Sequence, residues 1–557
     1  MHAMDWHRTG GRIGGSLAVA MAAAGLPALA ADLGTQAAEV FSPVTFSVQD
    51  STWEGNPYDV EASATFTHEG SGEAITTYLY HDGGDRWRFR FTGTRPGRWR
   101  FETAGDDADL AGHTGAVEVK ANPAARGFLT GRSTKYARMV GSPDRLEAQP
   151  YVVWMNQRAP DEAVNPGFGS DNLAEDWGGE ANAERRAAYL KQAKEHGANA
   201  VFLHVKNEWL QAGAQGHDDH DSVNPDRAVF AAIEDLVRDA HEAGMQVHLW
   251  AWGDESHRKW TPAGLPGGIN GKVDRRIQRY IADRLGPLPG WSIGYGFDLF
   301  EWTSQEEVSA WANFINERSG WVHNFSARGL PLLGPDGTEA SAPPNFLDSY
   351  ASLIRGGQIL QTDASRPVDD GGPDSYAETL ENVQNDPARP IIYEERHAYK
   401  RYWNRGDSAW PTTDMDGTRR LYWWWTMAGG AGGWIGFYDG GVSRPGPYPN
   451  PEQLRTHGQF WKDRLELDMV PANELAGGTP VTGVALADPA RDRIVIYVED
   501  ASEVALRLGE CEGPWQAVAV DARQPYAEQP LDAVEAGDQT LELPGKSDWA
   551  VSLVRAE

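Results

Sequence analysis

The chain has 557 residues, of which 40% are hydrophobic, so it is long enough for more than one domain with a sizeable core. Its 80 acidic residues outnumber its 50 basic ones and give a net charge of −30. This balance argues against partners that require a basic protein face, such as nucleic acids and anionic membranes. Cys511 is the single cysteine, which excludes an internal disulfide and a cysteine-based metal cluster.

The N-terminus has the pattern of an export signal. Arg8 and Arg12 precede an apolar run from Gly14 to Leu29, and Ala28-Leu-Ala30 fits the small-x-small rule for cleavage. We therefore predict a signal peptide over residues 1–30 and a secreted or periplasmic protein. The run is short and rich in alanine, so we do not expect it to span a membrane.

Residues 38–122 are expected to form an N-terminal β-sandwich. The segments 86–91 and 98–101 alternate aromatic residues with arginines, and Thr94-Arg-Pro-Gly97 between them is typical of a turn. Short strands separated by frequent turns favour two packed sheets.

Residues 127–465 change to an alternation of strands and helices. Eight apolar segments are predicted as strands: 151–155, 198–204, 246–252, 291–299, 321–327, 359–363, 390–393 and 433–438. Helical stretches such as 183–196, 227–243, 273–285 and 305–317 lie between them. Such alternation predicts a parallel sheet, and eight units favour a closed (β/α)8 barrel of the α/β class.

From residue 470 the chain is β-rich again. Strands are predicted at 493–498, 504–508, 516–520 and 548–554. We therefore expect a second, small β-sandwich over residues 470–557.

Two acidic sites follow strands of the predicted barrel. Glu301 comes after the fourth strand, and Glu394 and Glu395 come after the seventh. In such barrels the active residues lie at the carboxyl ends of the strands. Two carboxyl groups on one rim are the groups that cleave a glycosidic bond, one as the acid and one as the nucleophile or base.

This placement resembles the superfamily of retaining glycoside hydrolases whose barrels carry the acid/base after strand four and the nucleophile after strand seven. The resemblance implies that Glu301 is the acid/base and that Glu395, five residues after Pro390, is the nucleophile. Glu394 is the alternative nucleophile. Phe300 stands where the superfamily usually has an asparagine, so either Asp298 or Asn207 takes that role or the sugar is held differently.

The flanking segments resemble domains that accompany such barrels. Asn56-Pro-Tyr-Asp-Val60, Tyr80-His-Asp-Gly-Gly84 and Gly112-His-Thr-Gly115 are similar to the β-sandwich domain found ahead of glycoside hydrolase barrels. Val495-Ile-Tyr497 and Asp548-Trp549 are similar to the small β-sandwich, named for collagen binding, that ends many of these proteins.

Aromatic residues are abundant, with 23 tryptophans, and several lie near predicted strand ends. Indole rings stack on sugars, and polar groups beside them hold hydroxyls. We predict that a poly- or oligosaccharide is bound by Trp154, His204, Asn207, Trp250, Trp252, Asp298, Trp302, His323, Arg328, His397 and Trp434. The basic segment 396–405 suggests an anionic sugar or a solvated loop. No cofactor and no metal ligand are predicted.

Two other functions compete with this interpretation. A non-catalytic carbohydrate-binding protein would use the same aromatic residues. A carbohydrate esterase would use Ser292 in Gly290-Trp-Ser-Ile-Gly294, but that motif precedes a strand-like segment, whereas a nucleophile elbow requires a strand, a sharp turn and then a helix. The segment 216–221 is rich in His and Asp but lacks the spacing of a catalytic zinc site, and a bound calcium ion there is left open.

Overall fold

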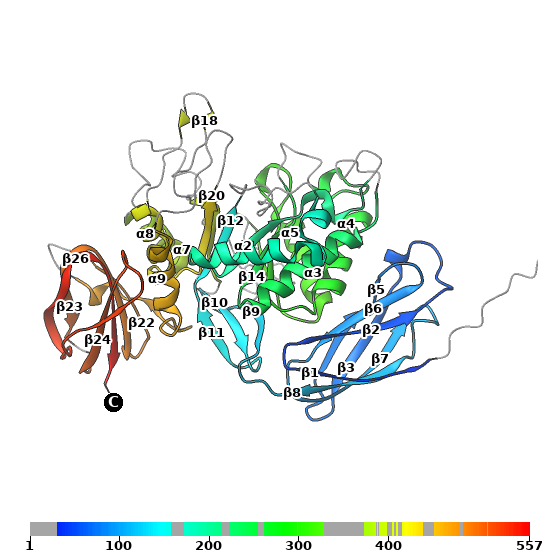
Figure 1. The fold of residues 1–557 in the computed structure, drawn as a ribbon, viewed down its shortest axis with the longest axis horizontal. Helices are drawn as coiled ribbons and strands as arrows, with labels where there is room; N and C mark the ends of the chain where they lie inside the picture. Colours follow the sequence, from blue (N-terminus) through cyan, green and yellow to red (C-terminus); the bar gives the residue numbers. More distant parts are fainter. Residues whose placement is uncertain are drawn as a thin grey trace, which may run out of the picture.

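The computed structural model describes residues 30–556, except 133, 157–171, 213–221, 254–260, 298, 328–372, 386, 388, 398–403, 406–407, 410–414, 438–449, 478–482 and 510. Figure 1 shows three parts along the chain: a β-rich unit, a parallel sheet with helices, and a second β-rich unit. Within these described ranges, no helix has the length and apolar character that crossing a membrane requires.

The N-terminal unit contains two sheets. One has the order β1-β8-β7-β3-β4 and the other β2-β6-β5. The strands are β1 (Asp32–Glu39), β2 (Pro43–Gln49), β3 (Ala62–His68), β4 (Ala74–Tyr78), β5 (Tyr80–His81), β6 (Arg86–Thr92), β7 (Gly97–Gly105) and β8 (Thr114–Lys120). All pairs are antiparallel except β1 with β8.

One aromatic core joins these two sheets. Phe46 of β2 and Phe89 of β6 stack with ring centroids 5.3 Å apart. Phe101 of the other sheet packs on both rings, at 4.7 Å from Phe46 and 5.2 Å from Phe89. The alternation of aromatic and arginine residues read from the sequence therefore places the aromatic side of each strand in the shared core.

The central part is built on a parallel sheet with the order β16-β15-β14-β13-β12-β20-β17. Its strands are β12 (Tyr151–Asn156), β13 (Ala200–His204), β14 (Gln246–Trp250), β15 (Trp291–Gly294), β16 (Asn324–Ser326), β17 (Ile392–His397) and β20 (Gly432–Phe437). These match seven of the eight predicted strands. The remaining predicted strand, 359–363, lies outside the described residues.

In the described part of the chain, helices lie between consecutive strands of this sheet, and the last of them follows β20 (Figure 1). They are α1 (Leu173–Trp177), α2 (Ala183–Glu195), α3 (Arg227–Glu242), α4 (Lys272–Leu285), α5 (Gln305–Ser319), α7 (Pro373–Asn385), α8 (Met415–Met427) and α9 (Pro451–Trp461). Helix α3 shows how its sequence sets its start, because the Asp226 side chain accepts hydrogen bonds from the backbone of Ala228 and Val229.

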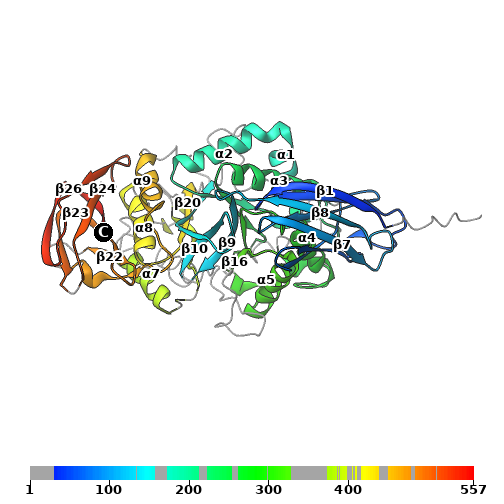
Figure 2. The ribbon, with the colours of Figure 1, turned by 90° about the horizontal axis from the view of Figure 1, so that it is seen from below.

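A small antiparallel sheet lies across the amino end of the parallel strands, and Figure 2 shows it from below. It consists of β9 (Arg126–Arg132), β10 (Lys135–Val140) and β11 (Leu146–Gln149). Tyr136 stacks on Tyr151, the first residue of β12, at 4.2 Å, and its hydroxyl donates to Gln246, the first residue of β14.

The C-terminal unit is one sheet with the order β21-β22-β23-β26-β24-β25. Its strands are β21 (Val470–Pro471), β22 (Val484–Ala487), β23 (Arg493–Leu508), β24 (Trp515–Asp521), β25 (Glu528–Pro530) and β26 (Gly537–Arg555). The two strands predicted over 493–508 are thus a single long strand, whose register on β26 shifts between Val498 and Glu503. One apolar cluster contains residues from both sides of this shift, so the sheet folds over on itself.

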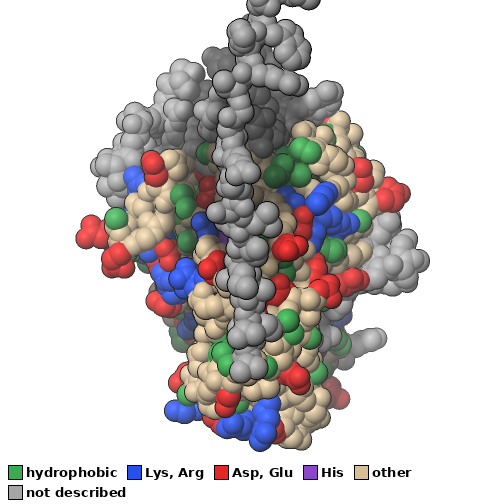
Figure 3. Space-filling view, turned by 90° about the vertical axis from the view of Figure 1, so that its right-hand side faces the viewer, with side chains coloured by type: hydrophobic (Ala, Val, Ile, Leu, Met, Phe, Trp, Pro, Cys, Tyr) green, Lys and Arg blue, Asp and Glu red, His purple; other side chains and the backbone are tan. Residues whose placement is uncertain are grey.

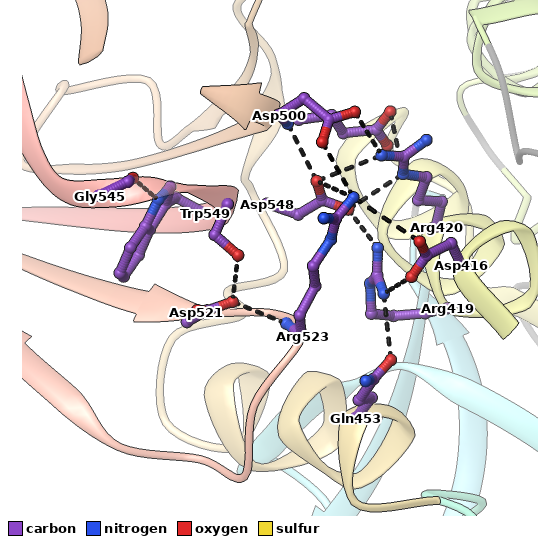
Figure 4. A network of polar contacts seen from close by, with 12 residues as sticks. Asp416, Arg419, Arg420, Gln453, Asp500, Asp521, Arg523, Gly545, Asp548 and Trp549 are labelled. Atoms are coloured by element: carbon purple, nitrogen blue, oxygen red, sulfur yellow. Dashed lines mark hydrogen bonds and ion pairs between the residues drawn. The ribbon is translucent and has the colours of Figure 1, made fainter. Parts of the chain in front are cut away.

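Buried ion pairs attach the C-terminal unit to the central part. Asp548 of β26 is fully buried and accepts hydrogen bonds from Arg419 and Arg420 of α8 (Figure 4). Burial alone would raise the pKa of Asp548, but hydrogen bonds and charge from Arg420 and Arg419 hold it below its ordinary value. The carboxylate therefore stays ionised inside this contact.

A comparable contact attaches the N-terminal unit. Arg90 of β6 makes a bidentate pair with Glu234 of α3, with distances of 2.7 and 2.9 Å, and Arg284 of α4 binds the same carboxylate. Burial would raise the pKa of Glu234, but the two guanidinium groups lower it. Both β-rich units are therefore held by arginine–carboxylate pairs taken out of water.

Candidate active site at the carboxyl ends of the parallel strands

The segment that carries Glu301 continues the fourth strand of the sheet. Beyond Gly294 the backbone stays bonded to the neighbouring strand, since Trp252 N donates to Tyr295 O at 2.9 Å and Phe297 N donates to Gly253 O at 3.0 Å. A short 3-10 turn, η6 (Leu299–Glu301), follows, and the Glu301 side chain is exposed. Glu301 thus lies beyond the carboxyl end of β15.

Trp302 anchors this turn. Its Nε1 donates to the carbonyl of Phe297 at 2.8 Å, and its ring stacks on Tyr295 with centroids 5.2 Å apart. Helix α5 then begins with a capping box made by Ser304 and Glu307. Since these two residues cap α5, the start of that helix does not require Glu301.

The segment that carries Glu394 and Glu395 belongs to β17. Tyr393 pairs with Gly433 of β20, and His397 pairs with Ile435, so β17 contains extra residues between these two pairs. Glu394 and Glu395 lie in this irregular part of the strand. Bulges of this kind redirect side chains and are common next to active sites.

Aromatic rings pack against one another on the inner face of the parallel sheet, toward the carboxyl ends of its strands. The Trp250 and Trp434 rings meet edge to face with centroids 4.7 Å apart. Phe297 lies 5.1 Å from Trp250, and Phe202 lies 4.7 Å from Trp434. Phe297 is only partly buried, whereas both tryptophans are fully buried.

Gly294 gives Trp250 its space. A Cβ on this glycine would lie 1.9 Å from the Trp250 ring, so no larger residue fits without moving the ring. The glycine that ends β15 therefore sets the position of the aromatic layer.

The carboxyl end of β13 carries a buried polar group of residues. His204 Nε2 donates to Trp252 O at 3.0 Å, and burial lowers the pKa of His204 well below its ordinary value, so the ring is neutral. The 3-10 turn η3 (Lys206–Trp209) follows, and Lys206, Asn207 and Glu208 in it are buried. Lys206 has φ of 58°, a backbone conformation that non-glycine residues adopt at a cost.

Not every predicted residue joins this group. Trp154 stacks on His196, next to α2, because its strand position faces the helices, whereas Val153 and Met155 face the interior. Trp252 belongs to the same cluster between sheet and helices.

His323 is also placed elsewhere. It precedes β16 and so lies at the amino end of the sheet, where Nε2 donates to Gly286 O at 2.7 Å and the ring stacks on Trp291. Burial lowers its pKa to about 4.

Some predictions fall on residues that the structure leaves undescribed. Asp298, Arg328 and the 216–221 segment lie outside the described residues, as do the side chains of Glu394, Glu395 and His397. Ser292 is described: it lies within β15, buried, with its Oγ 2.6 Å from the Tyr151 hydroxyl and 2.9 Å from His248 Nδ1. That position inside a strand lacks the strand–turn–helix context of an esterase nucleophile.

Three residues near these strand ends were not predicted from the sequence: Phe297, Lys206 and Glu208. Lys206 and Glu208 are charged residues directly after an apolar strand, and this signal was available in the sequence. Phe297 gave no such signal, because one more aromatic residue in an apolar segment is typical of the core.

Comparisons with known proteins fit this geometry. Residues 177–440 match the family described as "Apiosidase-like, catalytic domain", and residues 37–106 match a domain of unknown function, DUF5060. No curated protein matches the chain.

Solved structures share the fold at low sequence identity. A protein from Bacteroides vulgatus ATCC 8482, described as a candidate glycoside hydrolase, is 13% identical, with a TM-score of 0.64 over 94% of this chain and 100% of its own. A family 5 glycoside hydrolase from the same organism is 14% identical, with a TM-score of 0.52 over 77% of this chain and 93% of its own. The family match and the shared fold together support a carbohydrate-active enzyme of the glycoside hydrolase type.

Proposed function

We propose that this protein is an exported glycoside hydrolase that cleaves with net retention. Glu395 attacks the anomeric carbon while the acid at the end of the fourth strand protonates the leaving oxygen. The same acid, now a carboxylate, then takes a proton from the water that releases the sugar. The strand order is the observation that supports this most. Because β15 and β17 are parallel strands of one sheet, the two acidic segments that follow their apolar residues lie toward the same, carboxyl end of the sheet.

The same strand order supports a closed eight-stranded barrel. β16 and β17 are the two edges of the seven-stranded sheet, and the predicted strand 359–363 falls between them in the sequence. We propose that this strand joins the two edges. On either side of the barrel we propose β-sandwich domains over 38–122 and 470–557, supported by the shared apolar core of each unit.

Two carboxyl groups compete for the role of the acid. Glu301 is the residue that the superfamily resemblance selects. Asp298 directly follows Phe297, whose backbone N–H bonds to Gly253 O, so it is nearer than Glu301 in the sequence to the extended fourth strand. Only one of the two carboxyl groups acts as the acid, and the experiment below separates them.

The match to the apiosidase-like family suggests glycans that carry apiose as the first substrates to test. The partly exposed Phe297 ring, with Trp250 and Trp434 beneath it, offers an apolar surface for a sugar face. The basic segment 396–405 makes an anionic glycan the preferred class among these.

Export is proposed on the N-terminal sequence alone. The charged start, the apolar run and Ala28-Leu-Ala30 support cleavage before Ala31. Mass spectrometry of the protein recovered from outside the cytoplasm is expected to give Ala31 as its first residue. A protein that retains Met1 would contradict export by this signal.

A glycan panel tests the proposed function. The full chain, Glu301→Gln and Asp298→Asn are incubated with apiose-bearing, anionic and neutral polysaccharides, and the released sugars are measured by chromatography. We expect the wild type to release sugar from at least one glycan and one of the two variants to lose about 10²- to 10⁴-fold of the rate, with its melting temperature unchanged.

The outcomes separate the alternatives. Loss in Glu301→Gln alone assigns the acid to Glu301, and loss in Asp298→Asn alone moves it to Asp298. Glycan binding without release of sugar by the wild type would replace the enzyme with a carbohydrate-binding protein. Release that survives in both variants would contradict the proposed mechanism.

A further inference from the structure

A second cluster of carboxylates lies in the N-terminal unit, far along the chain from the proposed active site. Asp50 follows β2, and Asp107 and Asp109 lie between β7 and β8. One carboxylate oxygen from each of the three residues lies within 4.8 Å of those of the others. Asp50 and Asp109 are buried, and Asp107 is partly exposed.

One oxygen of this cluster has no hydrogen-bond partner among the described residues. Asp50 is 0% exposed, and its Oδ1 accepts hydrogen bonds from the backbone N–H groups of Thr52 and Trp53, both at 2.9 Å. Its Oδ2 is equally buried but accepts no hydrogen bond. A buried carboxylate oxygen without a partner is costly, because it has lost water and received nothing in exchange.

Other acidic residues of the unit pair with arginines. On the face shown in Figure 3, basic and acidic side chains lie side by side. Arg95 pairs with Glu73 at 2.8 Å, and Arg86 pairs with Asp82 at 2.7 Å. Within the described ranges, neither Asp50 nor Asp107 forms an ion pair with a lysine or an arginine.

The local backbone holds the three carboxylates in place. Asp109 N donates to Asp107 Oδ1 at 2.9 Å, which orients that carboxylate within its loop. The Thr52 hydroxyl lies 3.3 Å from Asp50 Oδ1 and 3.1 Å from Asp109 Oδ2, and so bridges the two segments. The carboxylates thus face one another from two different loops instead of turning away into water.

We propose that Asp50, Asp107 and Asp109 bind a calcium ion. Calcium prefers oxygen ligands, accepts six to eight of them with flexible geometry, and takes carboxylates singly or in pairs. The three acidic groups supply the charge, and the Thr52 hydroxyl and water complete the shell. Magnesium fits less well, because it requires a nearly ideal octahedron and gives up its water reluctantly.

The position of this site suggests what the ion does. The segment that starts at Asp50 leads to η1 (Pro57–Asp59), which contacts the central part. Asn56 Nδ2 donates to Asn224 Oδ1 at 2.7 Å, and Asp59 makes a bidentate pair with Arg276 of α4, both distances being 2.7 Å. A calcium ion would tie the start of this segment to the β7–β8 loop and so stabilise the contact between the N-terminal unit and α4.

The test uses calcium chloride alone on the full chain, independently of any glycan. After treatment with EDTA, the wild type is titrated with Ca²⁺ by calorimetry, and its melting temperature is measured with and without 5 mM of the ion (roughly 10 times the Kd expected of extracellular calcium modules). Terbium provides a second readout, because the backbone N–H of Trp53 donates to Asp50 Oδ1 and its indole is the nearest tryptophan in sequence that could sensitise the luminescence of the ion.

Three variants make the test specific. Asp107→Asn and Asp109→Asn each replace a carboxylate with a neutral amide, and Asp106→Asn is the matched control, since Asp106 is exposed and outside the cluster. We expect Ca²⁺ to raise the melting temperature of the wild type and of Asp106→Asn by several degrees. The two ligand variants should bind at least about 10-fold more weakly. In EDTA, Asp107→Asn should melt no lower than the wild type, because it relieves repulsion between carboxylates.

Absence of any calcium effect on the wild type at 5 mM would overturn the proposal. Equal calcium responses in Asp106→Asn, Asp107→Asn and Asp109→Asn would overturn it too, since the ion would then bind elsewhere. A magnesium response as large as that of calcium would contradict the choice of ion.

Discussion

The two ends of the parallel sheet are built in opposite ways. At the amino end, β9–β11 cover the strands, and the contacts are buried: Tyr136 stacks on Tyr151, and Lys135 Nζ donates to Gly429 O at 3.0 Å. At the carboxyl end the strands run into turns with an exposed carboxylate at Glu301, an irregular register in β17 and an unusual backbone at Lys206. Regular, buried packing at one end supports the irregular geometry at the other.

This contrast indicates where substitutions will act. Changes at the amino end should lower the stability and leave the chemistry intact, as is typical of barrels of parallel strands. Changes to the carboxylates at the carboxyl end should remove the chemistry and leave the stability intact. The following substitutions test whether the two ends separate in this way.

The largest effect is expected at the proposed nucleophile. Glu395→Gln should lower kcat by roughly 10³- to 10⁶-fold, because the amide cannot attack the anomeric carbon, and its melting temperature should stay that of the wild type. Glu394→Gln is the matched control and should lose far less. If Glu394→Gln is the variant that loses activity, Glu394 and not Glu395 is the nucleophile.

At the opposite end, Tyr136→Ala should lower the free energy of unfolding by about 3–5 kcal/mol, since it removes a fully buried aromatic ring. Tyr136→Phe keeps the ring and loses the polar contacts of the hydroxyl, among them the hydrogen bond to Gln246, so about 1 kcal/mol is expected. Urea denaturation measures both. At a temperature where each variant is folded, kcat should equal that of the wild type; a large fall in kcat would break the separation of the two ends.

Lys135 gives the amino end a pH dependence. Burial lowers its pKa from 10.5 to about 8 in the folded protein. Between pH 8 and pH 10.5 Lys135 is protonated in the unfolded chain but largely neutral in the folded protein. The free energy of unfolding therefore rises with pH in this window, and this gain is lost as the pH falls through 8. Lys135→Met should therefore flatten the pH dependence of stability by at most about 1.4 kcal/mol per pH unit in this window. Identical slopes in the variant and the wild type would show that Lys135 titrates normally.

The smallest effect at the carboxyl end is expected at Gly294. A methyl group there would lie 1.9 Å from the Trp250 ring, and moving that ring should cost about 1–3 kcal/mol of stability. Because Trp250 lies under the proposed sugar site, Gly294→Ala should also raise KM while kcat changes little. An unchanged KM would place the bound sugar away from this aromatic layer.

Much of the fold could be predicted from the sequence because parallel strands buried on both faces appear as continuous apolar runs. The small antiparallel sheet β9–β11 was not predicted, because Lys135 and Arg138 interrupt its apolar pattern although both are buried. The orientation of Trp154 could not be predicted either. Side chains alternate between the two faces of a strand, and an apolar run does not show which of its residues face the interior.

The candidate site was predictable in part. Positions after the fourth and seventh strands follow from counting strands, whereas the approach of side chains from different strands depends on tertiary structure. The carboxylates of Asp50, Asp107 and Asp109 show the same limit, because residues from separate loops become neighbours only after folding.

The configuration of the first product tests the central claim most directly. Proton NMR during the first minutes of cleavage reports the anomer released, before mutarotation mixes the two forms. A nucleophile at residue 395 working with an acid after the fourth strand predicts the same anomeric configuration as in the substrate. Release of the opposite anomer would mean that water attacks the sugar directly, and would contradict a covalent intermediate on Glu395.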